Sequence, residues 1–139
     1  MEFKKLGTKY ILRLDKGEEV IETLKHFCVD NNIKLGHISG LGATNKIRVG
    51  YFDVNKKEYF SREFEGDFEI APMVGNISTM DGEVYLHCHV NFGDEKFEAH
   101  AGHLNSAIIS ATFEVIIDVI DGVVEREFSE EIGLNLYKF

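Results

Sequence analysis

The segment Val84-Tyr85-Leu86-His87-Cys88-His89-Val90-Asn91-Phe92 alternates strictly between two kinds of side chain. Its even-numbered positions are all apolar, whereas the odd-numbered positions carry Tyr85, His87, His89 and Asn91. Successive side chains of a β-strand point to opposite faces of the sheet, so this pattern predicts a strand with one face in the core. His87 and His89 then emerge side by side on the other face, where two imidazoles can hold a metal.

A second pair of histidines follows in Ala99-His100-Ala101-Gly102-His103, and the turn residues Gly93-Asp94-Glu95 predict that the two segments form a hairpin. Strict alternation, with the two alanines facing the core, places His100 on the face of the first pair. A glycine within a strand often marks a bulge, and one extra residue near Gly102 would place His103 there instead. Alternation alone leaves both histidines as candidates.

This group of histidines predicts a metal site. Neutral imidazole binds Zn, Ni, Cu and Fe, and three histidines with one open position form a common arrangement. We therefore expect a divalent transition metal, with zinc as the first candidate, bound by His87, His89 and a third histidine from the following strand.

The rest of the chain predicts an α+β fold. Helical spacing of apolar residues after Asp15 and Glu18, which resemble a capping box, predicts one amphipathic helix over about residues 17–31. Everything after it predicts mainly antiparallel β-sheet, on which the helix packs. Glycines within residues 35–43 predict a bend or bulge. The expected strands cover residues 9–14, 34–41, 44–53, 58–64, 69–79, 83–92, 96–103, 110–120 and 122–128, and residues 132–136 could add a last short one.

Composition narrows the class of protein. The 139 residues are 44% hydrophobic, which suits one domain over residues 1–139. No apolar run is long enough to cross a bilayer, so we expect a soluble cytoplasmic protein with no membrane partner. Cys28 and Cys88 lie at apolar positions and are expected to be buried thiols. The net charge of −9 and the lack of a basic stripe disfavour direct binding to nucleic acid.

Several blocks of the chain resemble the PPC domain family, named for plants and prokaryotes, in its stand-alone prokaryotic type. The resemblance rests on residues 39–43, 49–53, 69–77, 86–90 and 101–104 in that order. It implies a compact antiparallel sheet with a flanking helix, assembled as a homotrimer. It also implies a metal site formed by His87, His89 and His103, which requires a bulge near Gly102, and His100 remains as a fourth or substitute ligand.

Family members are often described as DNA-binding, but this chain lacks the Arg-Gly-Arg-Pro of an AT-hook. Its leading predicted role is therefore a homotrimeric metal-binding regulator that is DNA-associated or senses a small-molecule ligand. The alternative is a metal-dependent enzyme of hydrolase or hydratase type acting on a small polar molecule, with Glu98 or Glu114 as base. The spacing of Gly82, the histidine pair, Glu95 and Gly102 also resembles the first metal motif of cupins.

Overall fold

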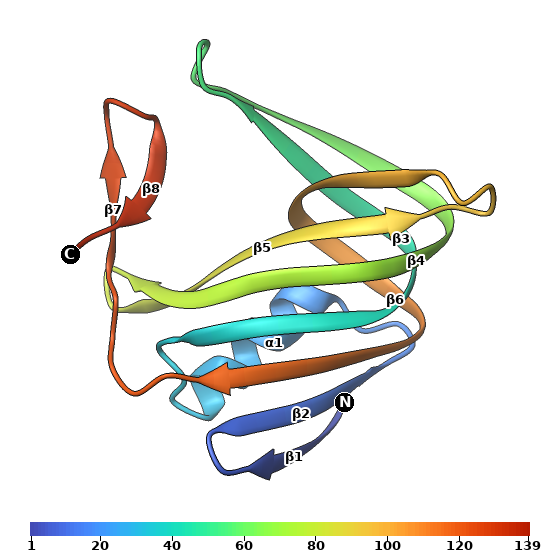
Figure 1. The fold of residues 1–139 in the computed structure, drawn as a ribbon, viewed down its shortest axis with the longest axis horizontal. Helices are drawn as coiled ribbons and strands as arrows, with labels where there is room; N and C mark the ends of the chain where they lie inside the picture. The colour runs from blue at the N-terminus through green and yellow to red at the C-terminus, as the bar shows by residue number, and fades with distance from the viewer.

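Three strands of this chain are far longer than the five or six residues typical of a strand, and they determine its shape. They are β3 (Gly36–Asp53), β4 (Glu58–Met80) and β6 (Ala99–Val119). The structure, a computed structural model, describes all residues 1–139. Figure 1 shows these strands crossing the molecule as bent ribbons, with β3 and β4 projecting beyond the sheet as a hairpin.

The antiparallel sheet contains six strands in the order β1-β2-β6-β3-β4-β5. A separate two-stranded hairpin, β7 with β8, follows at the C-terminal end. The bounds of the remaining elements are β1 (Glu2–Leu6), β2 (Lys9–Asp15), α1 (Val20–Asp30), β5 (Glu83–Gly93), β7 (Arg126–Ser129) and β8 (Leu134–Tyr137). The predicted class, mainly antiparallel β-sheet with one early helix packed on it, is confirmed.

Strand β6 closes the sheet on itself. Its first residues pair with β5, its middle and end pair with β3, and its last part also pairs with β2. Because β5 is otherwise the edge of the sheet, this additional pairing curls β3, β4, β5 and β6 into a closed circuit. The curl leaves one face for the core and α1, and it turns the other face outward.

The helix begins later than the sequence predicted. Its N-cap is Glu19, whose carboxylate accepts a hydrogen bond from the Glu22 N–H. Residues 17 and 18 are instead held by β6, because the Gly17 N–H donates to Ile109 O and the Glu18 carbonyl accepts from Ile109 N–H. These two hydrogen bonds hold residues 17 and 18 beside Ile109, so the helix starts after them. Glu18 still accepts from the Asp15 N–H, which explains why the pair resembled a capping box.

Several expected strands merge into longer ones. The predictions over 34–41 and 44–53 fall in β3, those over 58–64 and 69–79 in β4, and those over 96–103 and 110–120 in β6. Glycines bend β3 without ending it: a Cβ at Gly40 or Gly42 would collide with the Phe113 region of β6, and the register shifts between these two glycines. The predicted bulge is therefore confirmed. Strand β1 was missed, whereas the short strand expected over 132–136 is present as β8.

The core lies between the inner face of the sheet and α1, and it contains 24 buried hydrophobic residues. Cys28 on α1 and Cys88 on β5 are both buried free thiols, as predicted. Burial raises the pKa of each thiol to about 12, which keeps both protonated. The only helix has 11 residues, too few for a membrane-spanning helix.

Replacement of Glu19 by Ala should destabilise the fold by about 2–3 kcal/mol. One carboxylate oxygen caps the helix, a contact worth about 1 kcal/mol, and the other accepts from the N–H of Ala107, a fully buried residue. Glu19→Gln, which keeps one acceptor, should recover part of the loss. Urea unfolding measures both, with exposed Lys25→Ala as a control expected within about 0.5 kcal/mol of the wild type. Equal stability of Glu19→Ala and Lys25→Ala would contradict this role.

Candidate metal centre

Three histidines converge on the outward face of the curled sheet. His87 and His89 stand two residues apart on β5, and His103 of β6 lies directly opposite His89. One ring nitrogen from each lies within 4.8 Å of the other two, and the Nε2 atoms of His87 and His89 are 3.2 Å apart. The ring centroids are separated by 5.0, 5.2 and 5.5 Å. The chain thus brings three imidazoles to one point.

These separations fit a tetrahedral metal ion. Zinc–nitrogen bonds of 2.0–2.1 Å with tetrahedral angles place ligand nitrogens about 3.3 Å apart. The His87–His89 spacing is close to this value, and small side-chain rotations of His103 would bring the third nitrogen to it. Three imidazoles leave the fourth tetrahedral position open to water or a ligand.

The expectation from strict alternation, that His100 joins this group, is wrong. Pairing of β5 with β6 is continuous from His89–His103 to Gly93–Ala99, so no bulge occurs at Gly102 either. His100 lies opposite Phe92, with its ring 5.3 Å from the Phe92 ring and its Nε2 3.2 Å from Asp94 Oδ2. The hairpin turn over residues 94–98 determines whether the odd- or the even-numbered residues of β6 share a face with His89. Counting across that turn predicted the even-numbered residues, whereas the odd-numbered ones lie on that face. The irregularity of β6 lies further along, at Asn105, where its register with β3 shifts.

A glycine on the neighbouring strand makes room for the Tyr59 ring beside His103. Gly50 of β3 pairs with His103, and the Tyr59 ring packs so closely over Gly50 that a Cβ there would overlap the tyrosine hydroxyl. That hydroxyl donates to Asn105 Oδ1 at 2.9 Å, and the Tyr59 ring meets the His103 ring edge-on. His103 is therefore held between a histidine and a fixed aromatic wall.

The histidines lie in a cleft of about 860 Å³ between two hairpins. Figure 1 shows β7–β8 rising beside the end of the sheet and the β3–β4 hairpin projecting above it. Residues of both hairpins line the cleft, and the two also touch: Lys57 Nζ donates to Glu130 O at 2.7 Å, and Gly133 lies against the Phe52 ring. The volume is of the size that takes a small organic molecule.

Burial favours the neutral, metal-binding form of His87 and His103. Desolvation, with smaller contributions from the nearby charges of His103, His89 and Arg126, lowers the pKa of His87 to about 4. Desolvation also lowers the pKa of His103, with a smaller contribution from His89. The neutral ring of His87, whose free lone pair can bind a metal, is therefore available below neutral pH, and the neutral form of His103 is favoured in the same direction.

The acids suggested by the sequence lie elsewhere. Glu98 and Glu95 are exposed residues of the β5–β6 turn, and Glu114 is an exposed residue opposite Arg13 on β2. None of the three lines the histidine cleft, and neither does any other Asp or Glu. Glu95 therefore does not take the place of the cupin carboxylate ligand.

Sequence reasoning missed most of the cleft walls. Arg126 is the main example, because a single arginine within an acidic C-terminal stretch gave no sign of being buried. Tyr59 and Asn76 come from strands that were predicted without their registers. The sequence did place Tyr85 on the same face of its strand as His87 and His89. This shared face is the one feature of the sequence that could have linked Tyr85 to the site.

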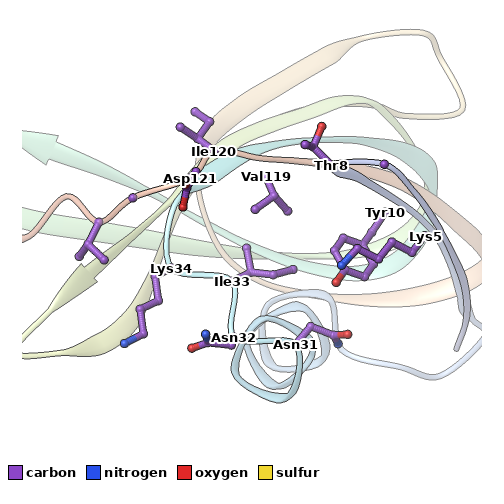
Figure 2. A pocket seen from close by; sticks show the side chains of 13 residues that line it. Lys5, Thr8, Tyr10, Asn31, Asn32, Ile33, Lys34, Val119, Ile120 and Asp121 are labelled. Carbon is purple, nitrogen blue, oxygen red and sulfur yellow. The ribbon is translucent and has the colours of Figure 1, made fainter.

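A second cavity, of about 450 Å³, lies away from the histidines (Figure 2). It is bordered by the β1–β2 turn, the end of α1 and the segment after β6, with Lys5 and Lys34 on its rim and Asp121 across from them. No group of potential metal ligands occurs there. The one group of potential metal ligands in the chain therefore lies in the histidine cleft.

Comparison with known proteins places these features in a wider group. A family model described as the Plants and Prokaryotes Conserved (PCC) domain matches residues 1–121. A Bacteroides thetaiotaomicron protein, described as a “putative DNA binding protein”, is 35% identical with a TM-score of 0.97, covering 99% of this chain and 96% of that chain. No curated protein matches.

Two archaeal structures are also similar along their whole length. A protein from Archaeoglobus fulgidus, described as metal-containing, is 33% identical with a TM-score of 0.88 and covers 100% of this chain and 99% of that one. A plant- and prokaryote-conserved (PPC) protein from Pyrococcus horikoshii is 31% identical with a TM-score of 0.87, covering 99% and 95%.

In the metal-free protein the His87 ring should titrate near pH 4 rather than near 6.5. Because its pKa is lower in the folded than in the unfolded state, the unfolded chain binds more protons between these values. The contribution of His87 to stability is therefore complete above pH 6.5 and declines as the pH falls toward 4. Ring-proton NMR gives the midpoint, and the free energy of unfolding of His87→Gln should vary less over this window. A midpoint near 6.5 would contradict the burial argument.

Proposed function

Because this chain belongs to the Plants and Prokaryotes Conserved (PCC, or PPC) domain family, we propose that it is a homotrimeric metal-binding protein that senses a small ligand. Each chain holds one divalent transition metal, with zinc as the first candidate, through His87, His89 and His103. The convergence of three imidazole nitrogens within 4.8 Å carries the proposal. The similar protein from Archaeoglobus fulgidus, described as metal-containing, supports it.

The cleft beside the histidines suits ligand recognition. When bound, the metal supplies a Lewis-acidic centre with one open coordination position facing the cleft. The protein supplies the walls: Tyr59 packs against His103 from one side, and residues of the two touching hairpins line the cleft. A small molecule that enters would meet the open position and the walls together.

Sensing is favoured over hydrolysis. A metal-dependent hydrolase or hydratase commonly places a side chain beside the metal that accepts a proton from the bound water, and Glu98 or Glu114 was the candidate for this role. Neither lines the cleft, and the cleft has no other carboxylate. The arrangement is therefore better suited to binding a molecule than to activating water against it.

A regulatory role does not require direct contact with DNA. The similar Bacteroides thetaiotaomicron protein is described as a DNA-binding candidate, but the present chain has a net charge of −9. Phosphate contacts dominate the affinity of nucleic-acid binders and need clustered Lys and Arg. We place the regulatory signal in the ligand and metal, with any effect on DNA passing through a partner.

An uncovered apolar row supports assembly into a homotrimer, as the family resemblance implies. Ile11, Ile116 and Val74 lie in one line across the outer face, since Ile11 pairs with Ile116, and Ser39 pairs with both Ile116 and Val74. They are 39%, 46% and 44% exposed, and Val74 lies opposite His89. Helix α1 packs on the opposite face of the sheet and therefore cannot bury this row. We propose that another copy of the chain packs against it.

Purified protein without an affinity tag should contain about one transition metal per chain. Variants His87→Ala and His103→Ala should lose it, because two imidazoles bind a divalent ion far more weakly than three. His100→Ala is the matched control, since His100 stands on the same hairpin but faces Phe92, and it should keep the metal. Elemental analysis after reconstitution and removal of free metal decides the result. A metal-free wild type, or equal loss in His100→Ala, would refute the assignment.

The protein should have a solution mass about three times the 15.8 kDa of one chain. Val74→Asp and Ile116→Asp should shift it toward the monomer, because each would place a charge in the proposed interface. Val29→Asp, on the exposed side of α1, is the control and should leave the assembly unchanged. Light scattering after size exclusion provides the mass. A monomeric wild type would refute the trimer without affecting the metal assignment.

A further inference from the structure

Arg126, the first residue of β7, carries a buried charge that has no acidic partner. It is 8% exposed, and none of the ion pairs of the chain includes it. Buried charges are normally paired, because the loss of hydration is otherwise uncompensated. Arg126 also lies beyond residues 1–121, the part of the chain that the family model matches.

Neutral groups fix the guanidinium without neutralising it. Its Nε donates to Ser78 Oγ at 2.8 Å and its Nη1 to the Asn135 carbonyl at 2.9 Å. Its Nη2 donates to Asn76 Oδ1 at 2.9 Å. An arginine has five N–H donors, so one hydrogen on each terminal nitrogen remains without a protein acceptor.

Two tyrosines hold the guanidinium from its sides. Its central carbon lies 4.8 Å from the centre of the Tyr85 ring and 4.3 Å from the centre of the Tyr137 ring. Cation–π contacts of this kind stabilise the charge partly and restrict the orientation of the planar group. The arginine is thereby pre-organised, with its remaining donors held in place.

Arg126 belongs to the same cleft as the histidines. Its hydrogen-bond partner Asn76 lies directly opposite His87 in the pairing of β4 with β5, and all three residues line the cleft. With no Asp or Glu in the lining, the cleft is a positive site within an acidic protein.

We propose that the cleft binds a small organic monocarboxylate whose carboxylate group is held by Arg126. The planar fork of arginine matches a carboxylate in a bidentate manner. The body of the ligand packs against the apolar part of the lining, to which Phe52, Leu134 and Leu136 contribute. The inference rests on the proposed function, since it names the ligand that the metal-binding protein senses.

A carboxylate fits this cleft better than a phosphate. Phosphate sites commonly use the N-terminus of a helix or a run of backbone N–H groups. The one helix of this chain does not line the cleft, and a single arginine provides its only permanent cation. Half of the 18 lining residues are hydrophobic, which favours a ligand with one charged end and an apolar body.

The test measures binding of butyrate, isobutyrate, benzoate and phenylacetate to the metal-loaded protein by calorimetry, each beside its neutral primary amide and inorganic phosphate. At least one acid should bind about tenfold or more tightly than its amide, and more tightly than phosphate. Arg126→Met should lose this preference, and Arg126→Lys should keep only part of it. The control Arg48→Met, which removes an exposed arginine paired with Glu63, should bind as the wild type does.

Thermal unfolding and the metal content of the protein separate the possible failures. The acid–amide comparison needs no variant, so it stands even if Arg126→Met does not fold, and thermal unfolding reports folding directly. If no acid exceeds its amide while one metal per chain is bound, the carboxylate inference is overturned and the metal proposal stands. If the metal is absent but an acid binds through Arg126, the carboxylate inference stands and the metal proposal falls. Stronger binding of phosphate than of every acid would also overturn it.

Discussion

The pairing of β6 with both β3 and β5 is the interaction on which the rest of this structure depends. One strand of 21 residues joins the middle of the sheet to its far edge and so closes it. Closure satisfies the backbone groups that an edge strand would leave unpaired. It also fixes His103 between Gly50 and His89, so the same hydrogen bonds that complete the sheet assemble the histidine site.

The rigid sheet provides the histidines, and the hairpins provide the walls around them. The three histidines lie on paired strands, where backbone hydrogen bonds hold their positions. Arg126 and Tyr137 come instead from the C-terminal hairpin, which lies beyond the residues that the family model matches. In the proposed mode of binding, the sheet supplies the histidine centre and the C-terminal hairpin supplies the arginine that holds the carboxylate.

Local sequence patterns predicted which helices and strands occur better than they predicted where each one begins and ends. Alternation revealed β5, and helical spacing revealed α1, because both depend on neighbouring residues along the chain. The start of the helix was misplaced, since residues 17 and 18 bond to Ile109, more than ninety positions away. The prediction also divided β3 into two strands near its glycines. In the structure, Gly40 and Gly42 bend β3 against Phe113 of β6, but the strand continues through the bend. A distant partner decided each of these boundaries.

By itself, the sequence determined the class of fold, through the periodicity of apolar residues along the chain. It also determined the core parity of β5 and the pair His87 and His89, because these follow from side-chain alternation within one strand. Alternation left His100 and His103 open and the family resemblance implied His103, but only the tertiary structure shows how His103 reaches the pair: the turn over residues 94–98 sets the phase of β6, and the register with β5 places His103 opposite His89. The same holds for Arg126, whose burial results from β7 packing beside Asn76 and Ser78, about fifty residues earlier in the chain. Alternation is a local property, whereas the meeting of strands from distant segments depends on pairing across the whole sheet.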